Sequence, residues 1–341
     1  MSEALLKIDD LHVSFATYAG KVQAVRGVDL SLEKGEIVAV VGESGCGKSV
    51  TAQTIIRLNP SPPCSIDGGS ILFQGTDLTS LPIKEIRKLR GSKIGMIFQD
   101  PMTSLDPTKQ VGTQIIEAIR RHEKVSKKEA FARSVEMLEL VGISNPVERM
   151  KQYPHEFSGG MRQRVMIAMA LANKPKLLIA DEPTTALDVT IQDQILRQLK
   201  ELEKEYGTSI IFITHDLGVV AELCDRVVVM YGGLVMEEAM IDDLFEMPGH
   251  PYTMGLLSSM PDIEQDKSIR LQPIPGSPPD MTNPPKGCPF APRCPYARSI
   301  CAAELPDFVE VGERHRTRCF LQYPDAPADA HNPFKKNPLK Q

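Results

Sequence analysis

One short stretch restricts the fold of this chain more than any other. The pattern G-x-x-x-x-G-K-[ST] is matched by Gly42, Glu43, Ser44, Gly45, Cys46, Gly47, Lys48 and Ser49. An apolar, β-branched run at 36–41 precedes the motif and predicts a buried strand leading into a tight loop. Glycines permit the turn that points successive backbone N–H groups at one anion. The sequence therefore predicts a loop that binds nucleotide phosphates, followed by a helix whose N-terminus faces them.

The residues at the end of this loop have separate expected roles. Lys48 is expected to reach the β- and γ-phosphates, and Ser49 to ligate Mg²⁺. Val50 and Thr51 open the following helix and are expected to lie near the α-phosphate. Cys46 occupies a permissive position of the motif, so its presence predicts no redox role.

Strands and helices alternate along residues 1–247. Further apolar runs with the character of strands buried on both faces lie at 95–98, 177–180, 210–213 and 227–230. Helical patterns such as 191–206 separate them, which predicts a doubly wound α/β core. The segment from about 107 to 160 carries helical patterns without a convincing strand, and we interpret it as a helical insertion.

Two acidic residues end one of the predicted strands. Asp181 and Glu182 follow the apolar run 177–180 directly. Open α/β sheets place ligands at the carboxyl ends of their strands, where the phosphate loop is also expected. Asp181 is therefore predicted to hold Mg²⁺, and Glu182 to polarise an attacking water as general base.

A second helix start carries small residues. Ser158, Gly159 and Gly160 precede a helical pattern at 161–172. Serine is a favoured N-cap and glycine is common beside it, so an ordinary cap explains the step by itself. A helix N-terminus of this kind is also able to bind an anion, but this motif alone favours the ordinary cap.

Together, these motifs resemble the ATP-binding cassette (ABC) family, in the right order from about residue 4 to residue 247. The run 157–161 resembles the family signature, with Phe157 and Met161 where Leu and Gln are commonest. The resemblance implies a P-loop NTPase with a RecA-like core, an antiparallel β subdomain and a helical subdomain. It also implies that two cassettes sandwich ATP head to tail, each phosphate loop facing the other cassette's signature.

The resemblance assigns further residues to the nucleotide site. It implies that Gln99 belongs to the Q-loop and helps to hold Mg²⁺ and water, and that Asp188 belongs to the D-loop. His215 resembles the switch histidine that contacts the γ-phosphate. Tyr18 is the expected aromatic that stacks on adenine, with Phe15 as the alternative.

The composition excludes several other classes of protein. Lys and Arg number 39 against 44 Asp and Glu, a net charge of −5, which disfavours a surface that coats nucleic acid. No apolar run approaches the ~20 residues that span a bilayer, and no signal peptide is visible. We therefore expect the chain in the cytoplasm.

The last part of the chain has a different composition. Prolines concentrate after residue 272, which predicts a loop-rich extension over 248–324 and a disordered tail over 325–341. The run 249–253, Gly-His-Pro-Tyr-Thr, resembles the C-terminal extension of ATPase subunits from oligopeptide and dipeptide importers.

The extension also contains a group of cysteines: Cys288, Cys294, Cys301 and Cys319. In a reducing compartment such a group favours metal over disulfides. The spacings are wider than those of the usual zinc hairpins, and residues alone leave an iron–sulfur cluster, zinc and free thiols open. The resemblance to the importer subunits implies a [4Fe–4S] cluster held by these residues.

The resemblance therefore implies an ATPase that couples energy to a bacterial peptide importer from the cytoplasmic face of the membrane. Its expected partners are a second cassette, two membrane permeases and an extracytoplasmic binding protein. Two alternatives remain open at this point: the same role with nickel or another small solute as cargo, and a non-transport cassette ATPase.

Overall fold

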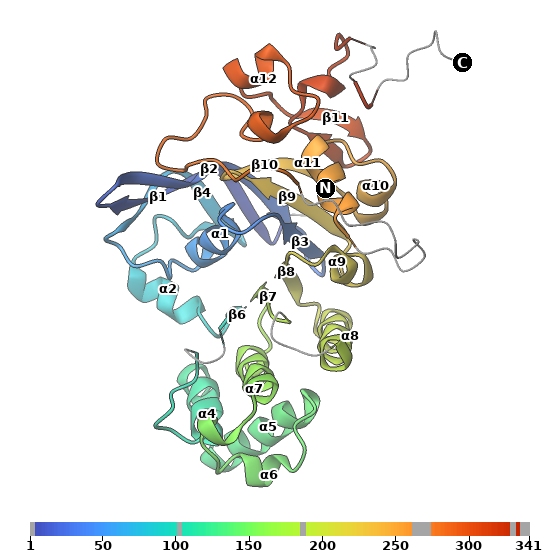
Figure 1. Ribbon diagram of the computed structural model, residues 1–341. Helices are drawn as coiled ribbons and strands as arrows, with labels where there is room; N and C mark the ends of the chain where they lie inside the picture. The colour runs from blue at the N-terminus through green and yellow to red at the C-terminus, as the bar shows by residue number, and fades with distance from the viewer. Residues whose placement is uncertain (1–3, 101–103, 185–188, 261–273, 328–331, 335–341) are drawn as a thin grey trace.

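The computed structural model describes residues 4–100, 104–184, 189–260, 274–327 and 332–334 (Figure 1). Within these ranges the molecule has a central mixed sheet, an antiparallel sheet, a lobe of helices and a C-terminal extension. None of the helices in the described ranges is both long and apolar enough to cross a bilayer.

The central sheet has the strand order β11-β12-β10-β9-β3-β8-β7-β6. Its strands are β3 (Ile37–Val41), β6 (Ile94–Ile97), β7 (Leu177–Asp181), β8 (Ser209–Ile213), β9 (Arg226–Tyr231), β10 (Leu234–Met240), β11 (Val309–Gly312) and β12 (His315–Thr317). The strands from β9 to β6 in this order run parallel, and β10, β12 and β11 continue the sheet antiparallel. The predicted strands 36–41, 95–98, 177–180, 210–213 and 227–230 all lie in this sheet, within a residue or so of their expected bounds.

The central strands are buried on both faces, as their continuous apolar runs indicate. In β3, Ile37, Ala39 and Val41 belong to one hydrophobic core, whereas Val38 and Val40 belong to the other. Alternating side chains thus fill two cores on opposite faces of one strand. The helices around the sheet are α1 (Lys48–Ile55), α8 (Val189–Tyr206), α9 (Leu217–Leu223), α10 (Ile241–Glu246) and α11 (Pro251–Ser258).

The antiparallel sheet has the order β2-β1-β4-β5. Its strands are β1 (Leu6–Thr17), β2 (Gly20–Leu32), β4 (Cys64–Phe73) and β5 (Thr76–Asp77). In β1 buried and exposed positions largely alternate, which is typical of a strand with one face on the core. This sheet is the antiparallel β subdomain that the family resemblance implies.

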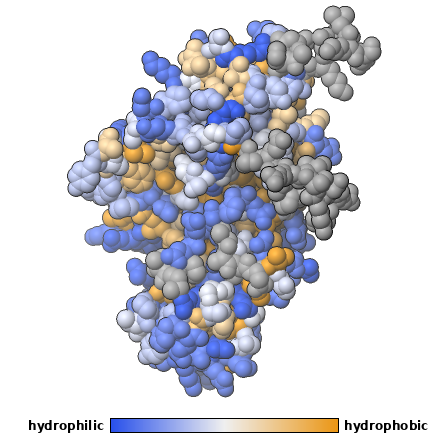
Figure 2. All heavy atoms as spheres, viewed as in Figure 1, coloured by the Kyte–Doolittle hydropathy of each residue, from blue (hydrophilic) through white to orange (hydrophobic). Residues whose placement is uncertain are grey.

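The lobe of helices lies below the central sheet in Figure 1. It contains α4 (Val111–His122), α5 (Lys127–Leu140), α6 (Pro146–Arg149), the 3₁₀ turn η1 (Pro154–Glu156) and α7 (Gly159–Leu171), with α2 (Ile83–Leu89) nearer the sheet. In the view of Figure 2 the outer surface of this lobe is mostly hydrophilic. Its helices therefore turn their apolar sides inward, and the segment around 107–160 is helical throughout its regular structure.

The C-terminal extension is mostly loop, with the short elements η2 (Ala291–Arg293), α12 (Ser299–Ala303) and η3 (Phe320–Gln322). It also adds the hairpin β11–β12 to the edge of the central sheet, because Glu237 and Glu238 of β10 pair with Thr317 and Arg316. Asn332, in the tail predicted to be disordered, is buried and donates to Leu321 O at 2.9 Å.

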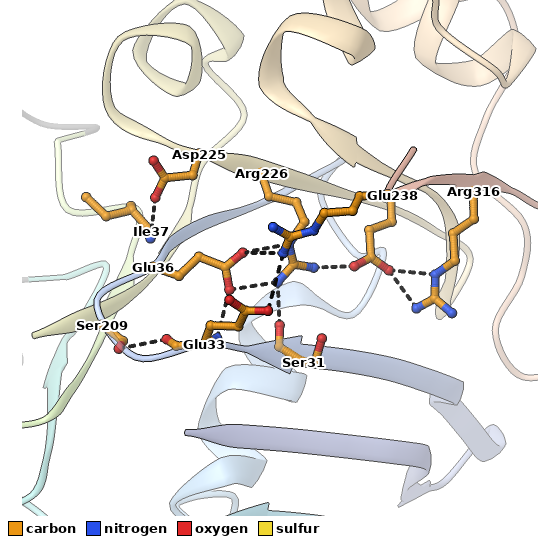
Figure 3. A network of polar contacts seen from close by, with 10 residues as sticks. Ser31, Glu33, Glu36, Ile37, Ser209, Asp225, Arg226, Glu238 and Arg316 are labelled. Carbon is orange, nitrogen blue, oxygen red and sulfur yellow. Dashed lines mark hydrogen bonds and ion pairs between the residues drawn. The ribbon is translucent and has the colours of Figure 1, made fainter. Parts of the chain in front are cut away.

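A buried ionic network joins the core, the antiparallel sheet and the extension (Figure 3). Arg226 is 2% exposed and donates to Glu36 through Nε at 2.8 Å and Nη2 at 3.0 Å. Its other nitrogen contacts Glu238, which also accepts from Arg316 Nε at 2.8 Å. Arg226 Nη2 further donates to Ser31 O at 2.6 Å. The extension is thus anchored to the same arginine that ties β9 to the N-terminal sheet.

Candidate functional site

The phosphate loop runs from the end of β3 into α1, as the motif predicts. At two positions of the loop, the backbone conformation and the close packing require glycine. Gly42 has φ 148°, and a Cβ there would lie 2.2 Å from Met230 O. Gly47 has φ 102°, and a Cβ there would lie 2.5 Å from Ala24 O. The loop is therefore held closely between β9 and β2 in a conformation that other residues rarely adopt.

The lysine and serine of the loop are preorganised. Lys48 is 6% exposed, and its Nζ donates to Gly42 O at 2.7 Å and to Glu43 O at 3.0 Å. Ser49 Oγ donates to Asp181 Oδ1 at 2.9 Å. Burial raises the pKa of Asp181, and the hydrogen bond from Ser49 opposes that rise. Two of the residues predicted to hold Mg²⁺, Ser49 and Asp181, thus lie in direct contact, which fits a hard cation that prefers oxygen ligands.

The carboxylate of Glu182 lies between two other predicted site residues. Gln99 Nε2 donates to Glu182 Oε2 at 3.0 Å, and His215 Nδ1 lies 3.6 Å from Glu182 Oε1. Glu182 has a positive φ of 48°, and its N–H donates to Ile213 O at 3.0 Å. These side chains come from the carboxyl ends of β6, β7 and β8, so the fold gathers them at one edge of the sheet.

The serine and glycines before α7 form a helix start in the helical lobe. Ser158 is the N-cap, and its Oγ accepts from Met161 N at 3.3 Å. A Cβ added at Gly159 would meet no atom within 4 Å, so this end of the helix is open. Figure 1 shows α7 in the lower lobe, well apart from α1. Ser158 and Gly160 are therefore not brought to the phosphate loop of their own chain.

Other predicted residues have different surroundings. Thr51 is buried and its hydroxyl donates to Gly47 O at 2.9 Å, so it stabilises the loop–helix junction, and Val50 beside it is half-buried. Tyr18 is fully exposed on the turn between β1 and β2, whereas Phe15 packs against the core. Of the two aromatic candidates, Tyr18 is the more exposed. Asp188 lies outside the described residues.

The cysteines of the extension line one cavity, together with His250 and Phe290. Cys288, Cys301 and Cys319 are buried, and Cys294 is partly buried. Burial, with a smaller contribution from neighbouring thiols, raises the pKa of Cys288 to about 12 and that of Cys294 to about 11. Across the described ranges, no set of three or more His, Cys, Asp or Glu side chains is arranged to hold a metal ion. The structure therefore gives a shared thiol cavity and does not support the metal-bound extension that the resemblance implies.

Two residues at the phosphate loop were missed as site residues by sequence reasoning. Arg293 pairs with the Glu43 carboxylate at 2.6 and 3.0 Å, and the Tyr252 hydroxyl accepts from Glu43 N at 2.8 Å. Tyr252 belongs to the Gly-His-Pro-Tyr-Thr run, but no local pattern in the sequence marks either residue as a neighbour of the loop.

A groove of about 570 Å³ lies between the sheet and the helical lobe. Apolar side chains line part of it, including Met96, Phe98 and Met166, whereas Arg87 and Arg121 give it positive charge. The groove borders the strand end that leads to Gln99.

Comparisons with known proteins agree with this geometry. A family profile described as "ABC transporter" matches residues 25–185, and one described as "Oligopeptide/dipeptide transporter, C-terminal region" matches residues 236–301. The chain is 59% identical to the oligopeptide transport ATP-binding protein OppD of Bacillus subtilis over 323 residues, covering 95% of this chain and 90% of that protein. It is 55% identical to the dipeptide transport ATP-binding protein DppD of the same organism, covering 94% and 95%.

A solved structure is similar as well. The dimeric, post-hydrolysis ATP-binding cassette MJ0796 bound to ADP and Pi aligns with a TM-score of 0.64 and 28% identity. The alignment covers 69% of this chain and 98% of that one.

Proposed function

The chain belongs to the ABC transporter family of ATPases, and we propose that it is the energy-coupling subunit of an importer for oligopeptides or dipeptides. The observation that carries the proposal is that the predicted site residues meet at one edge of the sheet: Ser49, Gln99, Asp181, Glu182 and His215. The same chain also matches the C-terminal region that is specific to oligopeptide and dipeptide transporters. That match favours peptide over nickel or another small solute as cargo, and it disfavours a non-transport ATPase.

The site residues have distinct roles in ATP hydrolysis. The loop N–H groups and Lys48 would bind the phosphates, and Ser49, Asp181 and Gln99 would hold Mg²⁺. When bound, Mg²⁺ neutralises charge on the phosphate oxygens. Glu182 takes a proton from the attacking water while the oxygen of that water forms a bond to the γ-phosphorus. The bond from the γ-phosphorus to the bridging oxygen breaks, and ADP and inorganic phosphate leave. His215 contacts the γ-phosphate.

The working form is a head-to-tail dimer. Ser158 and Gly160 lie apart from the phosphate loop of their own chain, so a second cassette must supply the signature that closes each ATP site. ATP then binds at the subunit interface, and its hydrolysis releases the two cassettes. The relative MJ0796 is a dimer with ADP and Pi bound, which supports this arrangement. The second cassette is a paralogue or an identical copy.

The permeases bind in the groove between the sheet and the helical lobe. Its apolar side chains and its charges at Arg87 and Arg121 suit a short amphipathic segment with acidic residues from a permease. Gln99, at the end of β6, links this groove to Glu182. The chain would then work at the cytoplasmic face of a bacterial membrane, beside two permeases that receive cargo from an extracytoplasmic binding protein.

We further propose that Cys288, Cys294, Cys301 and Cys319 hold a [4Fe–4S] cluster. The chemistry of the donors, rather than their present arrangement, is the ground for this proposal: the four cysteines line one cavity, and thiolates are the ligands of such clusters. A bound cluster would supply a staple for a segment with little regular structure. Anaerobically purified protein should absorb near ~400 nm, and Cys294→Ser should remove the band while Cys224→Ser keeps it.

Purification of the tagged chain from detergent-solubilised membranes tests the transport role. Mass spectrometry should identify two polytopic permeases and a second cassette. Recovery of this chain only with ribosomes or DNA would overturn the importer assignment, and permeases of a nickel importer would change the cargo.

A further inference from the structure

The C-terminal extension binds Glu43 of the phosphate loop through two kinds of bond. Arg293 Nη1 donates to Glu43 Oε2 at 2.6 Å, and Arg293 Nη2 donates to Glu43 Oε1 at 3.0 Å. The Arg293 side chain is 5% exposed and that of Glu43 is 26% exposed. A bidentate pair of this kind fixes orientation as well as distance.

The backbone of the same loop residue is held by a second group. The Tyr252 hydroxyl accepts from Glu43 N at 2.8 Å, and Tyr252 is fully buried at the start of α11. Burial raises the pKa of Tyr252, so its phenol stays neutral. The side chain and the backbone of Glu43 are therefore both bound by residues that lie after the ABC core.

Arg293 is itself hydrogen-bonded to the extension and to β9 of the central sheet. Its Nε donates to Pro275 O at 2.9 Å, its Nη2 to Ile274 O at 3.0 Å, and its Nη1 to Tyr231 OH at 3.0 Å. The rings of Tyr231, Tyr252 and Phe290 pack against one another with centroids 4.6 to 5.4 Å apart. Phe290 and the neighbour of Arg293, Cys294, both line the thiol cavity. The position of Arg293 therefore depends on how this segment folds.

We propose that Arg293 and Tyr252 are positioning residues for nucleotide binding, which hold the phosphate loop through Glu43 in the conformation that accepts ATP. A loop that is ordered before binding loses less conformational entropy when the phosphates arrive. Arg293 also neutralises a carboxylate that would otherwise lie unpaired beside the nucleotide's negative charge. The folded state of the cysteine-lined segment thereby sets the ATP affinity of the cassette. This proposal rests on the phosphate loop and not on the cargo.

The test measures ATP affinity and steady-state kinetics of the full chain. Arg293→Met should weaken ATP binding roughly tenfold, which corresponds to the loss of about one charged hydrogen bond. Tyr252→Phe should weaken ATP binding by a smaller factor. Because neither residue touches the reacting atoms, KM should rise while kcat stays within about twofold. Arg314→Met is the matched control, since Arg314 lies in the extension, is 48% exposed and pairs with Glu33 and Glu36.

A double variant distinguishes positioning of the phosphate loop through Glu43 from a general effect of Arg293 on the stability of the fold. If Arg293 acts through Glu43, Arg293→Met combined with Glu43→Gln should lose no more affinity than Arg293→Met alone. Deuterium uptake across 42–49 should rise in Arg293→Met and stay unchanged in Arg314→Met. Wild-type ATP affinity in Arg293→Met, or additive losses in the double variant, would overturn the proposal. If Arg293→Met does not fold, Tyr252→Phe tests the proposal by the same measurements. Wild-type ATP affinity in Tyr252→Phe would also overturn the proposal.

Discussion

The amide of Gln99 donates a 3.0 Å hydrogen bond to the carboxylate of Glu182, across 83 residues of sequence. The bond joins the end of β6, which borders the groove proposed for the permease, to the proposed general base at the end of β7. A movement of the permease segment would therefore reach the Glu182 carboxylate through one side chain. Under the proposed roles of these residues, the bond would couple transport to hydrolysis.

Replacement of the proposed base should stop turnover and spare binding. Glu182→Gln keeps the side-chain shape and removes proton acceptance, so kcat should fall by about 10²- to 10⁴-fold. ATP should still bind, and ATP-bound dimers should accumulate. Phosphate release and retained nucleotide are the measurements. Glu201→Gln, at an exposed position of α8, is the control. Normal hydrolysis in Glu182→Gln would eliminate this residue as the base.

Replacement of Lys48 in the phosphate loop should lower the affinity for ATP. Lys48 is buried and its ammonium already faces the loop, so Lys48→Met keeps the bulk and removes the charge that meets the phosphates. Loss of charged hydrogen bonds predicts ATP binding weaker by about ten- to a hundredfold. Titration with a fluorescent ATP analogue measures the effect, and Lys34→Met at an exposed position should bind normally. Unchanged affinity in Lys48→Met would contradict the assignment of the loop.

The contact between Ser49 and Asp181 predicts a specific metal phenotype. Ser49→Ala removes one Mg²⁺ ligand, so the Mg²⁺ concentration for half-maximal ATPase activity should rise about tenfold. ATP binding in EDTA should be unaffected, which provides an internal control. An unaltered Mg²⁺ requirement would show that Ser49 is not a ligand.

The buried pair of Arg226 and Glu36 predicts a pH-dependent stability. Burial alone raises the pKa of Glu36, but the hydrogen bonds and charge of Arg226 outweigh it and leave the pKa lowered. The unfolded chain then takes up the proton first, so the pair stabilises fully above about pH 4.5 and progressively less as pH falls through the lowered pKa. Glu36→Gln should cost about 3 kcal/mol at pH 7, because it leaves Arg226 underpaired.

Urea unfolding at pH 7 and at pH 4 measures this difference. The destabilisation by Glu36→Gln should shrink in acid, where the wild-type pair is itself weakened. Glu33→Gln, whose side chain is 51% exposed, should change little at either pH. An equal loss at both pH values would argue against an ionised pair.

The parts of the fold that local pattern determines were predictable. β3, β7, β8 and β9 each contain a continuous apolar run because both faces are buried, and the loop after β3 is a dense motif whose glycines Gly42 and Gly47 the backbone requires. The sequence pattern alone did not locate β1, β2 and β4. Their register shifts interrupt the alternation that one-sided burial produces, and the antiparallel sheet was expected only from the family resemblance.

The contacts made by the extension could not be predicted, because they join residues far apart in sequence. Arg293 and Glu43 are separated by 250 positions, and the pairing of β12 with β10 depends on a hairpin of short, partly exposed strands. Composition correctly indicated a loop-rich segment there, but it gave no sign that this segment would reach the phosphate loop.

The central claim is that ATP hydrolysis by this chain drives peptide uptake. Its most direct test is accumulation of a labelled oligopeptide by cells whose only copy of the chain carries Glu182→Gln, compared with wild-type cells that contain the same amount of protein. We expect accumulation to be abolished in the variant while the complex still assembles in the membrane. Peptide uptake at the wild-type rate in the variant would contradict the claim.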